Sequence, residues 1–117
     1  ARTVDRPAGG GLTIPGTGSQ IGLYLQPPGS AAPRAADPTG LYALFIGGND
    51  ITGALGLGSP AAAQAAVAAA GNAVVAQTQA LVNAGARNVV VFTLGGLSRT
   101  PGVLANPGVA PLVDQLT

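Results

Sequence analysis

Two apolar segments joined by a long helix-forming segment constrain the fold of this chain more than any other feature. Residues 41–46 and 88–94 are apolar without polar alternation, which is typical of strands that are covered on both faces. Between them, residues 60–84 place most of their large apolar residues on one helical face. The order strand, helix, strand predicts a βαβ unit over residues 41–94, with parallel strands and a right-handed crossover.

The ends of the predicted helix carry residue types that begin and end helices. Ser59 is a preferred N-cap residue, and Pro60 at the first helical position loses no hydrogen bond. Gly85 supplies the left-handed conformation with which helices commonly end. The apolar face of this helix consists of Val67, Val74, Val75, Leu81 and Val82.

The segments outside this unit contain little that would cover a parallel sheet. Residues 1–40 are rich in Gly and Pro and predict loops, in particular over residues 1–18. Residues 19–26 fit either a short helix or an alternating strand, and we favour the helix. Residues 95–117 predict a loop and the start of another helix.

Two parallel strands and one helix cannot cover both faces of a sheet, because parallel sheets need neighbouring strands and helices on each side. We therefore expect the 117-residue chain to be an incomplete part of a larger α/β domain. The helix that starts at the end of the chain supports this expectation.

The composition leaves few groups for acid–base or metal chemistry. The chain has no His and no Cys, so it lacks the commonest general base, the commonest transition-metal ligand and any thiolate. Its four acidic residues are all Asp, which are few for a metal cage. We expect no metal and no cofactor, and a chain that is poorly equipped for catalysis by itself.

Charge and hydropathy also argue against two kinds of partner. The net charge is +1 and the charged fraction is 8%, so the surface has no basic stripe for nucleic acid. The five cations are scattered along the chain as Arg2, Arg6, Arg34, Arg87 and Arg99. No uninterrupted apolar run suggests a transmembrane segment, because polar residues break the Ala-rich stretch at 61–76, and no signal-peptide pattern is visible.

The tetrapeptide that follows the first predicted strand is the strongest candidate for a functional site. Ligands of open α/β sheets bind beyond the carboxyl ends of the strands, where Gly47 and Gly48 allow a tight turn and a close approach to the backbone. Asn49 would point a neutral NH₂ donor into this crevice, which suits stabilisation of an oxyanion. Asp50 is placed to cap the next segment or to bond backbone amides and fix the loop. The alternative is an ordinary turn in which Asn and Asp bond their own backbone.

A longer segment around this tetrapeptide, "ADPTGLYALFIGGNDI", contains a Leu-Tyr pair followed by Gly-x-Asn-Asp. It resembles the third sequence block of the SGNH/GDSL hydrolases, which are Ser esterases and lipases of flavodoxin-like α/β fold. Downstream, "LVNAGARNVVVFTLGGLSRTP" is similar to the helix end and strand that come next in the family. Ala1-Arg2 is similar to the end of the second block, whose glycine would then directly precede the chain.

The resemblance implies a role for Asn49 as an oxyanion-hole residue, supported by Gly47, Gly48 and Asp50. It also implies a flavodoxin-like parallel-sheet sandwich, a small-molecule or lipid ester as substrate, and a secreted or cell-surface location. The chain departs from the family pattern, because it has neither the Gly-Asp-Ser block of the nucleophile nor the Asp-x-x-His block of the base. Gly95-Gly96 also stands where relatives often have Pro after the second strand.

These departures predict a partial hydrolase domain over residues 1–117 that is inactive alone, because a Ser nucleophile needs a base. Ser19, Ser30, Ser59 and Ser98 all lie outside any predicted strand-to-helix elbow. The missing parts of the same domain are then the main partner of the chain.

Two other interpretations remain. A non-catalytic passenger or interaction domain could keep the same scaffold. A Rossmann-like nucleotide-binding module is less favoured, because no Gly-x-Gly-x-x-Gly lies between a strand and a helix.

Overall fold

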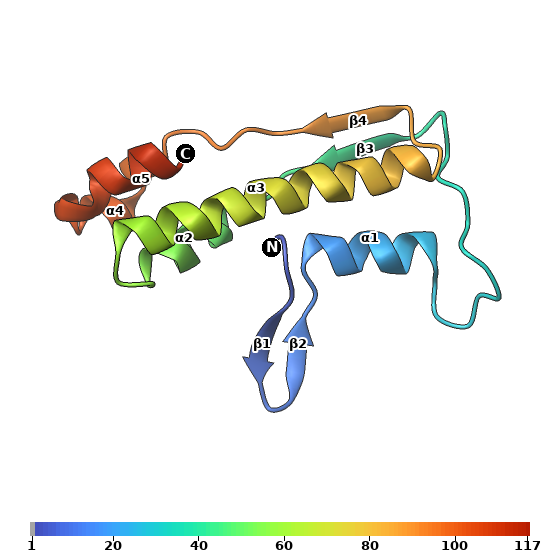
Figure 1. Cartoon of the computed structure of the whole chain (residues 1–117), viewed down its shortest axis with the longest axis horizontal. Helices are drawn as coiled ribbons and strands as arrows, with labels where there is room; N and C mark the ends of the chain where they lie inside the picture. Colours follow the sequence, from blue (N-terminus) through green and yellow to red (C-terminus); the bar gives the residue numbers. More distant parts are fainter. Residues whose placement is uncertain (1) are drawn as a thin grey trace.

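The computed structural model describes residues 2–117, so Ala1 and its match to the second sequence block lie outside the described residues. The chain forms an elongated α/β structure with principal extents of 51 × 35 × 24 Å (Figure 1). Its elements in chain order are β1 (Arg6–Gly9), β2 (Leu12–Ile14), α1 (Thr17–Leu25), β3 (Leu41–Leu44), α2 (Gly48–Leu55), α3 (Pro60–Asn83), β4 (Asn88–Val91), η1 (Leu97–Arg99), α4 (Pro101–Leu104), η2 (Pro107–Val109) and α5 (Ala110–Leu116).

The predicted strands pair with each other in parallel, as expected for a βαβ unit. Leu41 lies opposite Asn88, and the register continues to Leu44 opposite Val91. Both strands are shorter than predicted, although the N–H of Phe92 still donates to the carbonyl of Leu44 at 2.9 Å. Helix α3 connects the two strands and runs beside them along the long axis of the molecule (Figure 1).

The ends of α3 are formed by the predicted residues. The Oγ of Ser59 accepts a hydrogen bond from the N–H of Ala62 at 3.2 Å, and Pro60 opens the helix. Gly85 follows the end of the helix with a φ of +112°, a backbone conformation that residues other than Gly rarely adopt. The predicted cap and stop are therefore confirmed.

The predicted apolar face of α3 is only partly buried. Leu81 is buried in the core, but Val75 is 69% exposed and Val82 is 46% exposed. The helix has 24 residues and a mean hydropathy of 1.3 in its most apolar window, which is long and apolar enough to cross a membrane by length and composition alone. Core helices of soluble proteins meet the same criteria, so the expectation that the chain contains no transmembrane segment stays a prediction.

The N-terminal region is more regular than its Gly and Pro content suggested. Residues 1–18 were expected to form a loop, but β1 and β2 pair as an antiparallel hairpin, with Arg6 opposite Ile14. Every residue of both strands is exposed, so no burial pattern marks them in the sequence. The helix favoured for residues 19–26 is present as α1, two residues earlier, and it covers one side of α3.

The buried side chains form two clusters at different ends of α3. The first cluster lies between α1, α3 and the two parallel strands and consists of Ala36, Leu44, Leu81 and Ala86. The second lies between α2, α3 and α5 and consists of Ile51, Ala54, Ala63 and Leu116. Residues 95–117 were expected to be a loop and a helix start, but they form four short helical elements that close this second cluster.

Candidate functional site

The candidate site is the point at which β3 passes into α2. Gly47 is the N-cap residue of α2 and has a φ of +114°. Its carbonyl accepts hydrogen bonds from the N–H groups of Asp50 and Ile51 at 2.9 and 3.0 Å. The tetrapeptide is thus the first turn of a helix that sequence reasoning missed, although Asp50 in the first turn is typical of a helix start.

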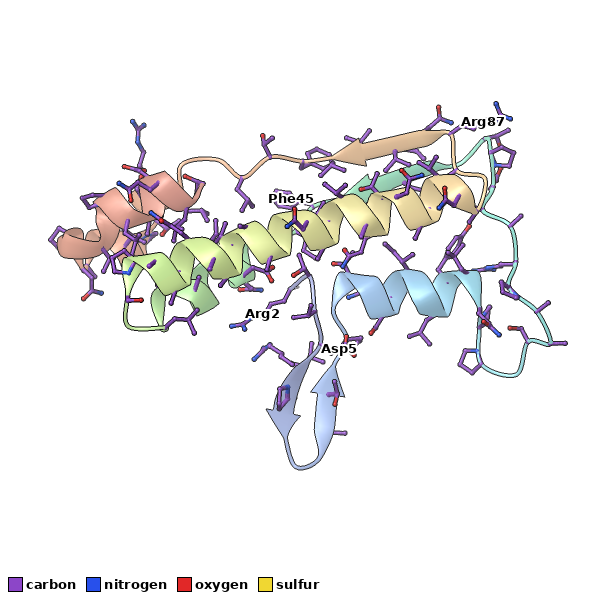
Figure 2. All side chains as sticks on the ribbon, in the orientation of Figure 1. Arg2, Asp5, Phe45 and Arg87 are labelled. Atoms are coloured by element: carbon purple, nitrogen blue, oxygen red, sulfur yellow. The ribbon has the colours of Figure 1, made fainter. Side chains whose placement is uncertain are left out.

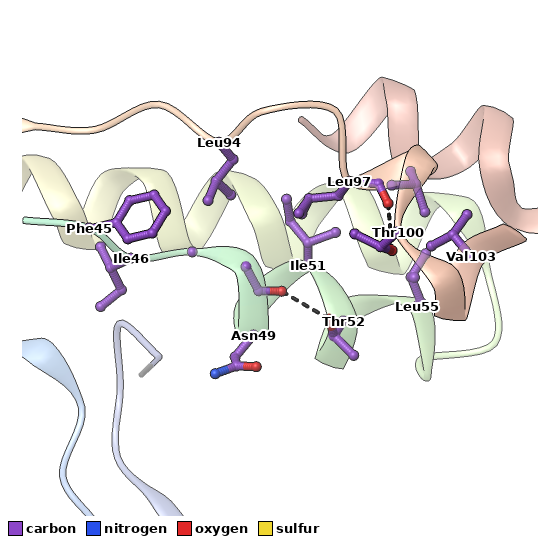
Figure 3. A pocket seen from close by; sticks show the side chains of 13 residues that line it. Phe45, Ile46, Asn49, Ile51, Thr52, Leu55, Leu94, Leu97, Thr100 and Val103 are labelled. Carbon is purple, nitrogen blue, oxygen red and sulfur yellow. Dashed lines mark hydrogen bonds between the residues drawn. The ribbon is translucent and has the colours of Figure 1, made fainter.

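Asn49 lies in this first turn, immediately beyond the carboxyl end of a parallel strand. Its side chain is exposed, and the residue lines a pocket of about 400 Å³ together with Gly47 and Gly48. Figure 3 shows its amide on the side of α2 that faces away from Leu94 and Leu97. The structure therefore places Asn49 and the two glycines at the rim of one cavity.

The walls of this pocket are mostly apolar. They come from the end of β3, from α2, and from the C-terminal helical elements, and consist of Phe45, Ile46, Ile51, Leu55, Leu94, Leu97, Val103 and Val113. The two hydroxyl groups in the lining are already used, because Thr52 donates to the carbonyl of Gly48 at 3.0 Å and Thr100 to that of Leu97 at 2.8 Å (Figure 3). Both threonines satisfy their hydroxyls locally, so the pocket suits an apolar group.

Asp50 bonds a backbone amide of a segment that is distant in the sequence. Its carboxylate accepts hydrogen bonds from the backbone N–H of Thr3 at 3.2 and 3.1 Å and from the Thr3 hydroxyl at 2.8 Å. These bonds reach a backbone amide, as one of the two predictions had it, but the amide lies 47 positions away and not in the adjoining loop. No sequence pattern could have indicated this partner.

Three of the four serines, Ser19, Ser30 and Ser59, form hydrogen bonds within the chain. Ser59 caps α3, and the hydroxyl of Ser30 donates to the carbonyl of Pro27 at 2.7 Å. The hydrogen bond from the Ser19 side chain is the main reason that the pKa of Asp5 is lowered, with the N–H of Gly16 as the second cause. Among residues 2–117, no three Asp side chains gather into a group that could hold a metal ion.

Comparison with known proteins assigns this chain to a protein family. The sequence model of the GDSL-like lipase/acylhydrolase family matches residues 2–116, and the chain belongs to this family.

Two curated proteins share part of the sequence. One is an uncharacterized protein of Pseudomonas putida, from the trpE-trpG intergenic region, with 44% identity over 77 residues. The other is Lipase 1 of Photorhabdus luminescens, with 41% identity over 69 residues. These matches cover 66% and 59% of the chain but only 12% and 10% of the respective relatives, so the chain spans about a tenth of their length. No solved structure matches the chain significantly.

Proposed function

We propose that the chain is the central part of a serine esterase or lipase domain that hydrolyses carboxylic esters. The observation that carries this proposal is the position of Asn49, which lies at the carboxyl end of a parallel strand and on the rim of an apolar pocket, in a chain of the GDSL-like family. In this proposal Asn49 is the oxyanion-hole residue. Gly48 leaves open space beside it, since a Cβ added there would meet no atom within 4 Å.

The chemistry of the Asn side chain suits this role. When a nucleophile attacks an ester carbonyl, negative charge develops on the carbonyl oxygen. A neutral amide can donate two hydrogens to that oxygen and does not titrate, whereas a carboxylate would repel it. The first turn of α2 adds the partial positive charge of a helix N-terminus at the same place.

The apolar pocket beside Asn49 would hold the acyl chain of the ester. Its volume of about 400 Å³ falls within the ordinary range for small-molecule sites. Its walls offer no charged side chain, and both threonine hydroxyls are already bonded, so an alkyl chain suits its mostly apolar lining. A carboxylic ester with an aliphatic acyl chain is therefore the proposed substrate.

The remaining parts of the active site would come from the rest of the same domain. The chain contains no His, and none of its serines stands in a Gly-Asp-Ser sequence. Within residues 2–117, β3 and β4 each have a single neighbouring strand, which leaves both outer edges unpaired. Phe45 is 73% exposed and packs edge-to-face on Phe92, which is 50% exposed. Additional strands and helices, arranged as a flavodoxin-like sandwich, would cover this apolar surface.

The alternative interpretation is a non-catalytic passenger or interaction domain on the same scaffold. Acylation by a fluorophosphonate probe separates the two proposals. The whole protein that contains this chain should react with the probe and hydrolyse p-nitrophenyl esters, whereas the isolated chain should do neither. Esterase activity that copurifies with the isolated chain would contradict the partial-domain proposal, and a whole protein without either activity would favour the non-catalytic role.

A further inference from the structure

Thr3 lies where the N-terminal segment meets three helices. It is 3% exposed and is the single buried polar residue among residues 2–117. Its carbonyl accepts hydrogen bonds from the Gln77 side-chain amide of α3 at 2.9 Å and from the N–H of Gly18 in α1 at 3.4 Å. The preceding carbonyl, of Arg2, accepts from the N–H of Thr17 at 2.9 Å. The segment is therefore held to two helices through its carbonyls.

The third helix holds the same segment through a carboxylate. Both oxygens of Asp50 receive the Thr3 N–H, and Oδ1 also receives the Thr3 hydroxyl at 2.8 Å. Hydrogen bonds to an ionised acceptor are stronger and more directional than neutral ones. This contact satisfies both donors of Thr3, which would otherwise be unpaired in a buried position.

The side chain of Arg2 extends the contact along α2. A Cβ added to Gly53 would come within 2.6 Å of the Arg2 guanidinium, so this side chain packs directly against the helix (Figure 2). Its Nε is buried without a hydrogen-bond partner, whereas the Asp50–Thr3 contact is a polar attachment between this segment and α2. We call the contact between the Asp50 carboxylate and Thr3 the Asp50 latch.

We propose that Asp50 is a positioning residue that acts through Thr3 on Asn49. Asn49 and Asp50 are consecutive in the first turn of α2, so anchoring the Asp50 side chain fixes the rotation of this turn and the direction of the Asn49 side chain. The proposal rests on the proposed function of Asn49 in the oxyanion hole. An oxyanion donor displaced by about 1 Å can lose roughly a hundredfold in rate, so a small rotation of the turn matters.

The latch can be tested in the whole protein with matched substitutions. Asp50→Asn removes the charge and one acceptor, and Thr3→Val removes the hydroxyl while keeping the side-chain shape. Both should lower kcat for p-nitrophenyl butyrate by about 10- to 100-fold with KM nearly unchanged. Thr3→Ser, which keeps the hydroxyl, should retain kcat within about threefold of the unaltered protein, since the charge-assisted bond survives. Asp37→Asn is the control, because that carboxylate bonds Thr39 in a different part of the chain.

A double-mutant cycle with Asn49→Ala separates positioning from general stability. If Asp50 acts through Asn49, Asp50→Asn should cost less than about twofold in kcat once Asn49 is Ala. Equal losses in both backgrounds, or an Asp50→Asn variant with normal kcat, would overturn the role of Asp50. If Asp50→Asn does not fold, the same comparison of kcat is made with Thr3→Val and Thr3→Ser, each with Asn49 and with Ala at position 49. An unaltered protein without esterase activity would instead overturn the proposed function together with the latch.

Discussion

The side chain of Leu94 lies against Gly47, so that a Cβ added to Gly47 would come within 3.1 Å of Leu94 Cδ1. Leu94 follows β4 and Gly47 follows β3, so this contact joins the ends of the two parallel strands at the candidate site. Gly47 also has a φ of +114°, which strains any other residue. The positive φ therefore favours Gly at this position, and Leu94 would have to shift by a few tenths of an ångström to admit a Cβ.

Substitution of the two site glycines should have opposite effects on stability. Gly47→Ala should lower the free energy of unfolding by about 1–3 kcal/mol, because Ala is strained at this φ and meets Leu94. Gly48→Ala is the matched control, since it lies inside α2 with open space around its Cβ position, and it should be neutral or stabilising by up to about 1 kcal/mol. Denaturant unfolding measures both, and equal destabilisation by the two variants would contradict this account of Gly47.

The acyl-chain pocket should respond to a larger side chain in its wall. Val103→Phe narrows the pocket, so kcat/KM for p-nitrophenyl octanoate should fall by about tenfold or more relative to p-nitrophenyl acetate. Leu104→Phe is the control, because Leu104 is 64% exposed and does not line the pocket. An unchanged octanoate-to-acetate ratio in the whole protein would mean that other segments of the protein fill this pocket.

The acid stability of the fold should depend on Asp37. The N–H and then the hydroxyl of Thr39 donate to its carboxylate, and both lower the pKa of Asp37 from the ordinary value of 3.8. A carboxyl whose folded-state pKa is lowered stabilises the fold above its unfolded pKa, and this contribution is lost as the pH falls through the lower folded-state value. The melting temperature should therefore vary less with pH below about 4 in Asp37→Asn than in the unaltered protein. Identical acid profiles would contradict the assignment.

The elements that could be predicted from sequence are those determined by neighbouring residues. The cap at Ser59 and the stop at Gly85 are local, and both strands of the βαβ unit are marked by continuous apolar runs. The β1–β2 hairpin was missed because all residues of its two strands are exposed. Their sequence therefore shows no alternation of buried and exposed residues that would indicate strands. Helix α2 was missed because it begins at Gly48 and contains another glycine, Gly53, which weakens its helix propensity.

The candidate site was only partly predictable for a physical reason. The tetrapeptide around Asn49 is contiguous, so its position after a strand could be inferred from the chain alone. The pocket wall is not contiguous, since Leu97 and Val103 reach it from helical elements formed about 50 residues later. The partner of Asp50 is equally remote, because Thr3 lies 47 residues earlier in the sequence. Contacts of this kind depend on the tertiary fold and leave no local pattern.

The most direct test of the central claim is the kinetic effect of Asn49→Ala in the whole protein. An oxyanion donor acts chiefly in the transition state, so kcat for p-nitrophenyl butyrate should fall by about 10²–10³-fold while KM stays within about threefold. Asn49→Asp, which keeps the shape but places a negative charge beside the oxyanion, should be at least as impaired. A rise in KM with an unchanged kcat would contradict the account, because Asn49 would then bind the substrate without stabilising the transition state.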